Sequence, residues 1–80
     1  MNERLKYMGR LQEKELELKK KALAMKSAID ILRDMLDPLE DLEDLRTDAI
    51  AEEALRLANL QIEYRAINAD IKAIRKILGR

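Results

Sequence analysis

Apolar residues recur at intervals of three, four or seven positions through the second half of the chain. Between residues 50 and 78 they are Ile50, Leu57, Leu60, Tyr64, Ile67, Ile71, Ile74 and Leu78. This spacing places them along one face of an α-helix. Neither proline nor glycine interrupts the run before Gly79. The pattern predicts a long amphipathic helix, with the rest of the chain packing against its apolar stripe.

A second apolar stripe lies upstream and predicts a first helix over residues 3–36. Its members are Leu18, Ala22, Met25, Ile29, Leu32 and Leu36, and a flanking set, Ala24, Ala28, Ile31 and Met35, widens the apolar face. Residues 12–21 are more polar, and a glycine such as Gly9 costs a helix about 1 kcal/mol relative to alanine. We therefore expect the first two or three turns to be the least stable part of the molecule.

The dipeptide Asp37-Pro38 is the clearest signal for a break between helices. A residue that precedes proline is disfavoured in the helical conformation, so the first helix should end near residue 36. The next helix could begin at Pro38 with Asp37 as its cap, or near Thr47, which is also a good capping residue.

Length decides between these two starts. A helix from residue 38 to residue 78 would overhang the first helix, whereas a helix over 47–78 matches it in length. We therefore predict a partly helical connector over residues 37–46 and a second helix over 47–78. The chain is then all-α, a single antiparallel helical hairpin that fills residues 1–80.

The second helix carries another apolar line, nearly opposite its main stripe at about 100° per residue. Its members are Ala51, Leu55, Ala58, Ile62, Ala66, Ala69 and Ala73. Alanine is the best helix former and is harmless in water, but Leu55 and Ile62 favour a close contact with another helix. A lone hairpin also has little core. We predict that two hairpins pair as a coiled-coil-like four-helix bundle, through Met35, Ala51, Leu55, Ala58, Ile62, Ala66 and Ala69.

Composition narrows the possible classes of function. Sixteen basic and sixteen acidic residues give a net charge of zero, so the overall charge does not predict a nucleic-acid or acidic-membrane partner. The chain has no cysteine, which leaves its redox compartment open. It shows no signal peptide and no apolar run near the roughly 20 residues that span a bilayer. We expect a soluble, cytoplasmic protein.

Few residues could carry chemistry. The absence of His and Cys excludes Ser-His and Cys-His dyads, imidazole ligands and thiolate metal sites, and Ser27 is the only serine. The acidic run from Asp37 to Asp48 does not match a calcium loop, because its sixth position is Leu42 instead of glycine. We predict no enzyme activity, no cofactor and no metal site.

Charge is distributed unevenly along the chain. Residues 1–26 carry eight positive and four negative charges, residues 27–53 carry two and ten, and residues 54–80 carry six and two. In a hairpin the first and last segments share one end, so this open end is basic and the turn is acidic. We expect a two-fold homodimer with turns at opposite ends, because that orientation lays each acidic turn beside a basic end.

Two segments resemble small helical-hairpin proteins encoded in the early regions of Mu-like transposable prophages. They are the turn Asp37-Pro38-Leu39-Glu40-Asp41-Leu42 and the closing segment from Glu63-Tyr64-Arg65 to Ile74-Arg75-Lys76-Ile77-Leu78-Gly79. The resemblance covers residues 30–80 and implies a helical hairpin, but it includes no catalytic or binding motif. The architecture is also similar to small dimeric RNA-binding bundles of the plasmid copy-control kind.

The sequence leaves two classes of function open. The first is a structural or protein-interaction module that self-associates through amphipathic helices, with room for a further protein partner. The alternative is a nucleic-acid-binding protein that uses the basic open end of the hairpin. Its contacts would be Arg4, Lys6, Arg10, Lys72, Arg75, Lys76 and Arg80. The balanced total charge makes the self-associating module the stronger hypothesis. We also expect no membrane partner.

Overall fold

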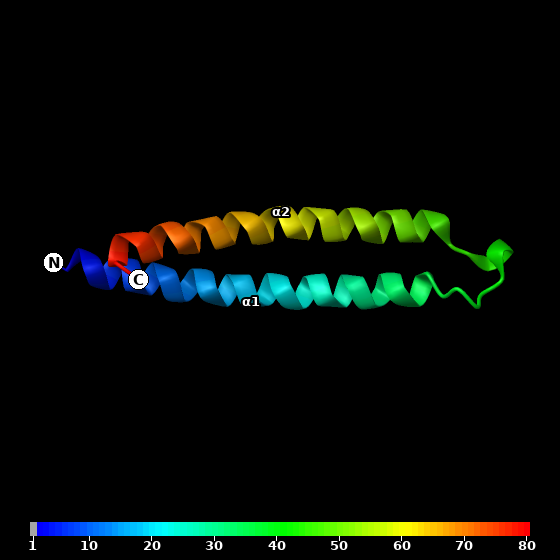
Figure 1. The fold of residues 1–80 in the computed structure, drawn as a ribbon, viewed down its shortest axis with the longest axis horizontal. Helices are drawn as coiled ribbons and strands as arrows, with labels where there is room; N and C mark the ends of the chain where they lie inside the picture. The colour runs from blue at the N-terminus through cyan, green and yellow to red at the C-terminus, as the bar shows by residue number, and fades with distance from the viewer. Residues whose placement is uncertain (1) are drawn as a thin grey trace.

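Two long antiparallel helices lie side by side in a computed structural model that describes residues 2–80 (Figure 1). Helix α1 runs over Glu3–Met35, a 3-10 turn η1 over Leu42–Asp44, and helix α2 over Thr47–Leu78. The described chain contains no strand and measures 64 × 17 × 14 Å. The predicted all-α hairpin is confirmed, as are the break after α1 and the start of α2 at residue 47.

The helix ends use local hydrogen bonds. The Asn2 side chain accepts a bond from the Arg4 N–H at 3.0 Å and so caps α1. At α2 the sequence prediction is wrong in detail, because Arg46 is the cap, without a side-chain bond, and Thr47 is the first helical residue. Gly79 closes α2 at φ 78°, in the left-handed region that glycine adopts without a steric penalty.

Aspartate side chains close the turns of the connector. Asp37 Oδ1 accepts a hydrogen bond from the Leu39 N–H at 3.0 Å, and Asp41 Oδ1 accepts one from the Glu43 N–H at 3.1 Å. Such bonds offer the backbone an alternative to a helix. No helix therefore starts at Pro38, and the connector contains only the short turn η1.

The packed face of α2 agrees with the predicted stripe. Ile67, Ile71, Ile74 and Leu78 are buried, and Ile50, Leu57, Leu60 and Tyr64 are partly buried. Glu53, also partly buried, fills the remaining position, so the face advances by alternating steps of three and four residues. This heptad spacing keeps one side of a helix against its neighbour along its whole length.

The packed face of α1 agrees with the predicted stripe at every second residue. At the residues between, it lies one position earlier in the chain. Its members are Tyr7, Leu11, Lys14, Leu18, Lys21, Met25, Ala28, Leu32 and Met35, all buried or partly buried. The stripe expected from the sequence ran through Ala22, Ile29 and Leu36, but Ile29 is 41% and Leu36 53% exposed, whereas Ala28 is 0% exposed. The two registers have the same spacing. The register that the helices use contains the polar residues Lys14 and Lys21, so the sequence does not show it as an apolar stripe.

The best-buried cluster lies toward the open end of the hairpin. Leu11 of α1 packs there with Ile67, Ile71, Ile74 and Leu78 of α2, and Tyr7, Met8 and Leu18 lie against them. The expectation that the first turns of α1 are the least stable part conflicts with this packing. The sequence prediction identified the α2 side of this cluster but missed Leu11, which stands among polar neighbours and was not assigned to a stripe.

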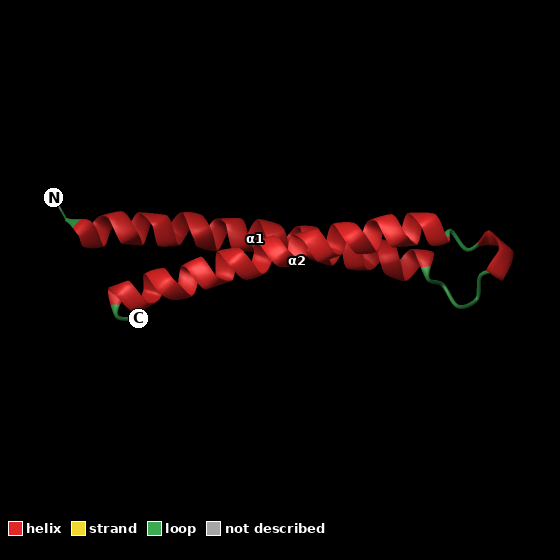
Figure 2. Cartoon of the chain, turned by 90° about the horizontal axis from the view of Figure 1, so that it is seen from above, coloured by secondary structure: helices red, strands yellow, loops and turns green. Residues whose placement is uncertain are grey.

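The two ends of the hairpin are not flush. The N-terminal turn of α1 extends past the C-terminal end of α2, and the connector extends past both helices at the opposite end (Figures 1 and 2). The acidic connector and the N-terminal turn therefore form the two tips of an elongated molecule.

Candidate self-association surface

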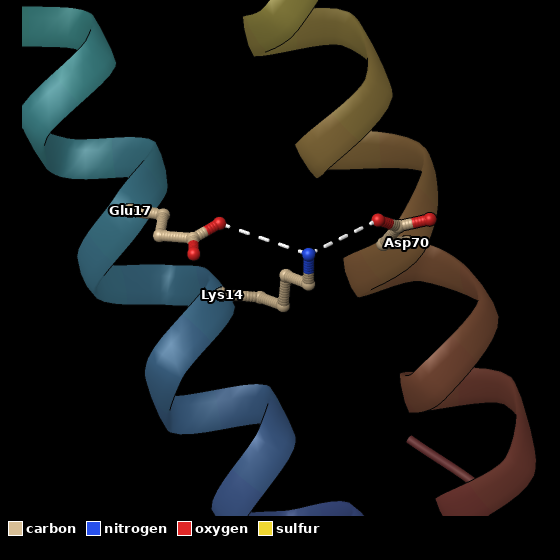
Figure 3. Close-up of polar contacts among 3 residues, drawn as sticks. All are labelled: Lys14, Glu17 and Asp70. Carbon is tan, nitrogen blue, oxygen red and sulfur yellow. Dashed lines mark ion pairs between the residues drawn. The ribbon is translucent and has the colours of Figure 1, made fainter.

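Two lysines within the packed face of α1 reach carboxylates on α2. Lys14 Nζ lies 3.4 Å from Asp70 Oδ2 and 3.7 Å from Glu17 Oε2 of its own helix (Figure 3). Lys21 pairs with Glu63 in the same way. The two lysines are seven residues apart, and so are the two acids, in reverse order. These pairs agree with the antiparallel register of the two helices, and the aliphatic parts of both lysines extend along the packed face.

Replacing Lys21 with leucine is expected to stabilise the hairpin by about 1 kcal/mol, because extra apolar burial outweighs the loss of an exposed ion pair. The Lys21 side chain is 35% exposed and Glu63 is 54% exposed, so the carboxylate stays hydrated after the change. Urea unfolding at fixed protein concentration measures the effect. Lys20→Leu is the control, since Lys20 is exposed; equal stabilisation by both changes would contradict a position for Lys21 in the packed face.

The outer face of α2 is apolar and exposed. Leu55 is 63% and Ile62 66% exposed, and Ala51, Ala58, Ala66, Ala69 and Ala73 beside them are exposed as well. This is the line that the sequence places opposite the main stripe, and no part of the chain within residues 2–80 covers it. Met35, the remaining residue predicted to mediate self-association, is instead partly buried in the packed face of α1. The exposed residues of the predicted self-association set therefore all belong to α2.

The connector carries a second set of exposed apolar side chains, with acidic residues around them in the sequence. Leu39 is 93% and Leu42 84% exposed, and both stand among the acids of the segment from Asp37 to Asp48. A hollow of about 230 Å³ at the same end is lined by Asp34, Met35, Glu40 and Arg46. Its lining offers two carboxylates, one guanidinium and one thioether, and no nucleophile with a neighbouring base.

The basic residues predicted as nucleic-acid contacts all lie exposed near the open end. Arg75 is 3.9 Å from Glu15 across the helix pair, and the Arg10 guanidinium lies 5.8 Å from the centre of the Tyr7 ring. Lys72 and Lys76 are one turn apart on α2. The hairpin thus brings cations from both termini to one end, as expected from the charge distribution.

Residues 2–80 contain neither a candidate metal site nor a candidate membrane-spanning helix. No group of three or more His, Cys, Asp or Glu side chains is arranged to hold a metal ion there. No helix in that range combines the length and apolarity needed to cross a membrane. No protein-family model, curated protein or solved structure matches this chain.

Proposed function

We propose that this chain is a structural or protein-interaction module that self-associates into a two-fold homodimer. The observation that carries the proposal is the outer face of α2, where Leu55 and Ile62 are both about two-thirds exposed in a line of alanines. Leucine and isoleucine gain about 1.5–3 kcal/mol each on full burial. A second helix with small side chains at the contact would cover them closely.

The size of the hairpin core supports the same proposal. Within the described chain six hydrophobic side chains are buried, whereas eleven large hydrophobic ones are exposed. A small domain with so little core usually depends on disulfides, a metal or oligomerisation. The chain has no cysteine and the described part has no metal cluster, so oligomerisation is the remaining means of support.

Charge favours one orientation of the two copies. Turns side by side would bring two acidic connectors together, whereas turns at opposite ends lay each connector beside the basic open end of its partner. A single exposed pair contributes about 0–1 kcal/mol and is screened by salt. Many pairs of the same sign preference add up, so they select an orientation even where apolar contact alone does not. The result is a four-helix assembly with the two α2 helices in contact.

Light scattering of the protein at 100 µM is expected to give the mass of a dimer. Ile62→Asp is expected to weaken the dimer roughly a hundredfold or more, because it places a charge in the apolar contact. Leu23→Asp is the matched control, since Leu23 is 68% exposed on α1 and Ile62 is 66% exposed on α2. High salt should also weaken association.

A monomeric wild-type protein at 100 µM would overturn the proposed function. Filter binding with DNA and RNA over a range of salt concentrations tests the other class of function. Salt-sensitive binding by a monomer at micromolar concentration would favour a nucleic-acid role for the basic open end.

A further inference from the structure

Along the outer face of α2, the residues that precede Ile62 are complementary in charge and size to the residues that follow it at equal distances. At steps of seven residues it reads Asp48, Leu55, Ile62, Ala69 and Lys76, and all five are exposed. Seven residues are close to two helical turns, so these side chains form a nearly straight line along the helix. The line starts with an acid, ends with a base and has Ile62 at its centre.

Residues at equal distances from Ile62 would meet if two α2 helices packed antiparallel with Ile62 on the symmetry axis. Asp48 would then face Lys76 of the second copy, and Leu55 would face Ala69, a large side chain against a small one. Glu52 and Lys72 are also equidistant from Ile62, but they flank the line on opposite sides of the helix, so they add charge at the two ends of the contact without facing each other. Opposite charges meet directly at the Asp48 and Lys76 positions on both sides of the axis.

The small residues beside this line are symmetric as well. Ala51 matches Ala73, and Ala58 matches Ala66, about the same centre. Small alanine side chains on both flanks of the line allow two helix axes to approach closely. The apolar contact and the charged contact therefore select the same register, although they depend on different residues.

The four charged residues are available for a partner. Asp48, Glu52, Lys72 and Lys76 are exposed, and none of them takes part in an ion pair within residues 2–80. The nearby ion pairs of α2 use Glu53, Arg56, Glu63, Asp70 and Arg75 instead. A parallel arrangement would place Asp48 against Asp48 and Lys76 against Lys76, which opposes association.

Ile62 also lies near the middle of the whole molecule. Its neighbour Glu63 pairs with Lys21, and the 18 residue-to-residue steps from Glu3 to Lys21 span about 27 Å at the helical rise. The full length is 64 Å, so an axis at Ile62 aligns two copies almost end to end. Because the connector and the N-terminal turn lie at opposite ends of the molecule (Figure 1), each connector is then at the same end as the N-terminal turn of the other copy.

We infer that the outer face of α2 binds a second copy of this chain across a two-fold axis beside Ile62, with Asp48 of each copy facing Lys76 of the other and with Glu52 and Lys72 adding charge of the same sign at the corresponding ends. This inference rests on the proposed self-association and adds its partner, register and orientation.

A single cysteine at the axis tests the register. The natural chain has no cysteine, so Ile62→Cys places one thiol per copy, and the two thiols face each other across the axis. Oxidised glutathione is expected to convert this variant to a disulfide-linked dimer at least tenfold faster than it converts Leu23→Cys. The two positions have similar exposure, 66% and 68%, so the difference reports proximity between copies.

Charge reversal tests the orientation. Asp48→Lys with Glu52→Lys makes the face wholly basic, and Lys72→Glu with Lys76→Glu makes it wholly acidic. Each double variant alone should dimerise roughly tenfold or more weakly than the natural chain at low salt. The chain with all four changes should recover, because every antiparallel pair is again of opposite sign. Far-UV circular dichroism checks that the exposed changes leave the helices intact.

The outcomes separate this inference from the proposed function. A monomeric natural chain overturns both. A dimer in which Ile62→Cys cross-links no faster than Leu23→Cys overturns the register alone. A dimer whose affinity is unchanged by both charge-reversed double variants overturns the antiparallel orientation, since those changes leave the parallel arrangement equally repulsive.

Discussion

Ile71→Asp is expected to unfold the hairpin at room temperature. Ile71 is 2% exposed and lies within the best-buried cluster, between Ile67 and Ile74. A carboxylate at this position would lose its hydration without gaining a partner, which costs several kcal/mol. A small domain is stable by only about 5–15 kcal/mol, and one of this length lies at the lower end. Far-UV circular dichroism should show most of the helical signal lost.

Ile77→Asp is the matched control for this change. It makes the same substitution on the same helix, but Ile77 is 59% exposed. The carboxylate would remain hydrated, so the helical signal and the urea midpoint should change little. Equal loss of structure in the two variants would mean that the packed face of α2 has been misidentified.

Leu11→Ala is expected to lower the free energy of unfolding by about 2–5 kcal/mol, the usual cost of truncating a buried leucine. Leu11 is 3% exposed and is the only fully buried α1 residue in the cluster of the open end. The void left behind would be surrounded by isoleucine side chains of α2, which relax only partly. Urea unfolding at fixed protein concentration, followed by circular dichroism, measures the difference.

Leu16→Ala provides the comparison, because Leu16 is on the same helix and 55% exposed. Its truncation should change stability by less than about 1 kcal/mol, as is usual for surface positions. If Leu11→Ala were no more harmful than Leu16→Ala, the N-terminal turns of α1 would be loosely packed after all. The polar composition of residues 12–21 by itself predicts that second outcome.

The inferred dimer has a consequence for the hairpin itself. If two copies share the outer face of α2, folding and association stabilise each other by mass action, so apparent stability should rise with protein concentration. The buried cluster lies near the open end, and Leu55, Ile62 and the adjoining alanines extend toward the turn. Association would then add apolar contact along most of α2, including the half near the turn that the hairpin buries less well.

The sequence by itself determined the secondary structure and the exposed face of α2. Asp37-Pro38 ends α1 for a stereochemical reason, and matched helix lengths place the start of α2 at Thr47. The apolar stripe of α2 could be identified because isoleucine and leucine occupy nearly every position of one heptad register. Leu55 and Ile62 stand apart from that register, so their exposure also follows from periodicity alone.

Only the tertiary structure decided which face of α1 packs. The registers through Ala22 and Ile29 and through Lys21 and Ala28 differ by one residue and have equal spacing. Local hydrophobicity favours the first, because isoleucine is more apolar than alanine and lysine is charged. Leu11 and Leu18 belong to both registers, and the packed helix uses the second, which places Tyr7, Lys14, Lys21 and Ala28 at the intervening positions against α2. Lysine tolerates the packed position because its aliphatic part extends along the packed face while its ammonium group reaches Glu63 at the edge.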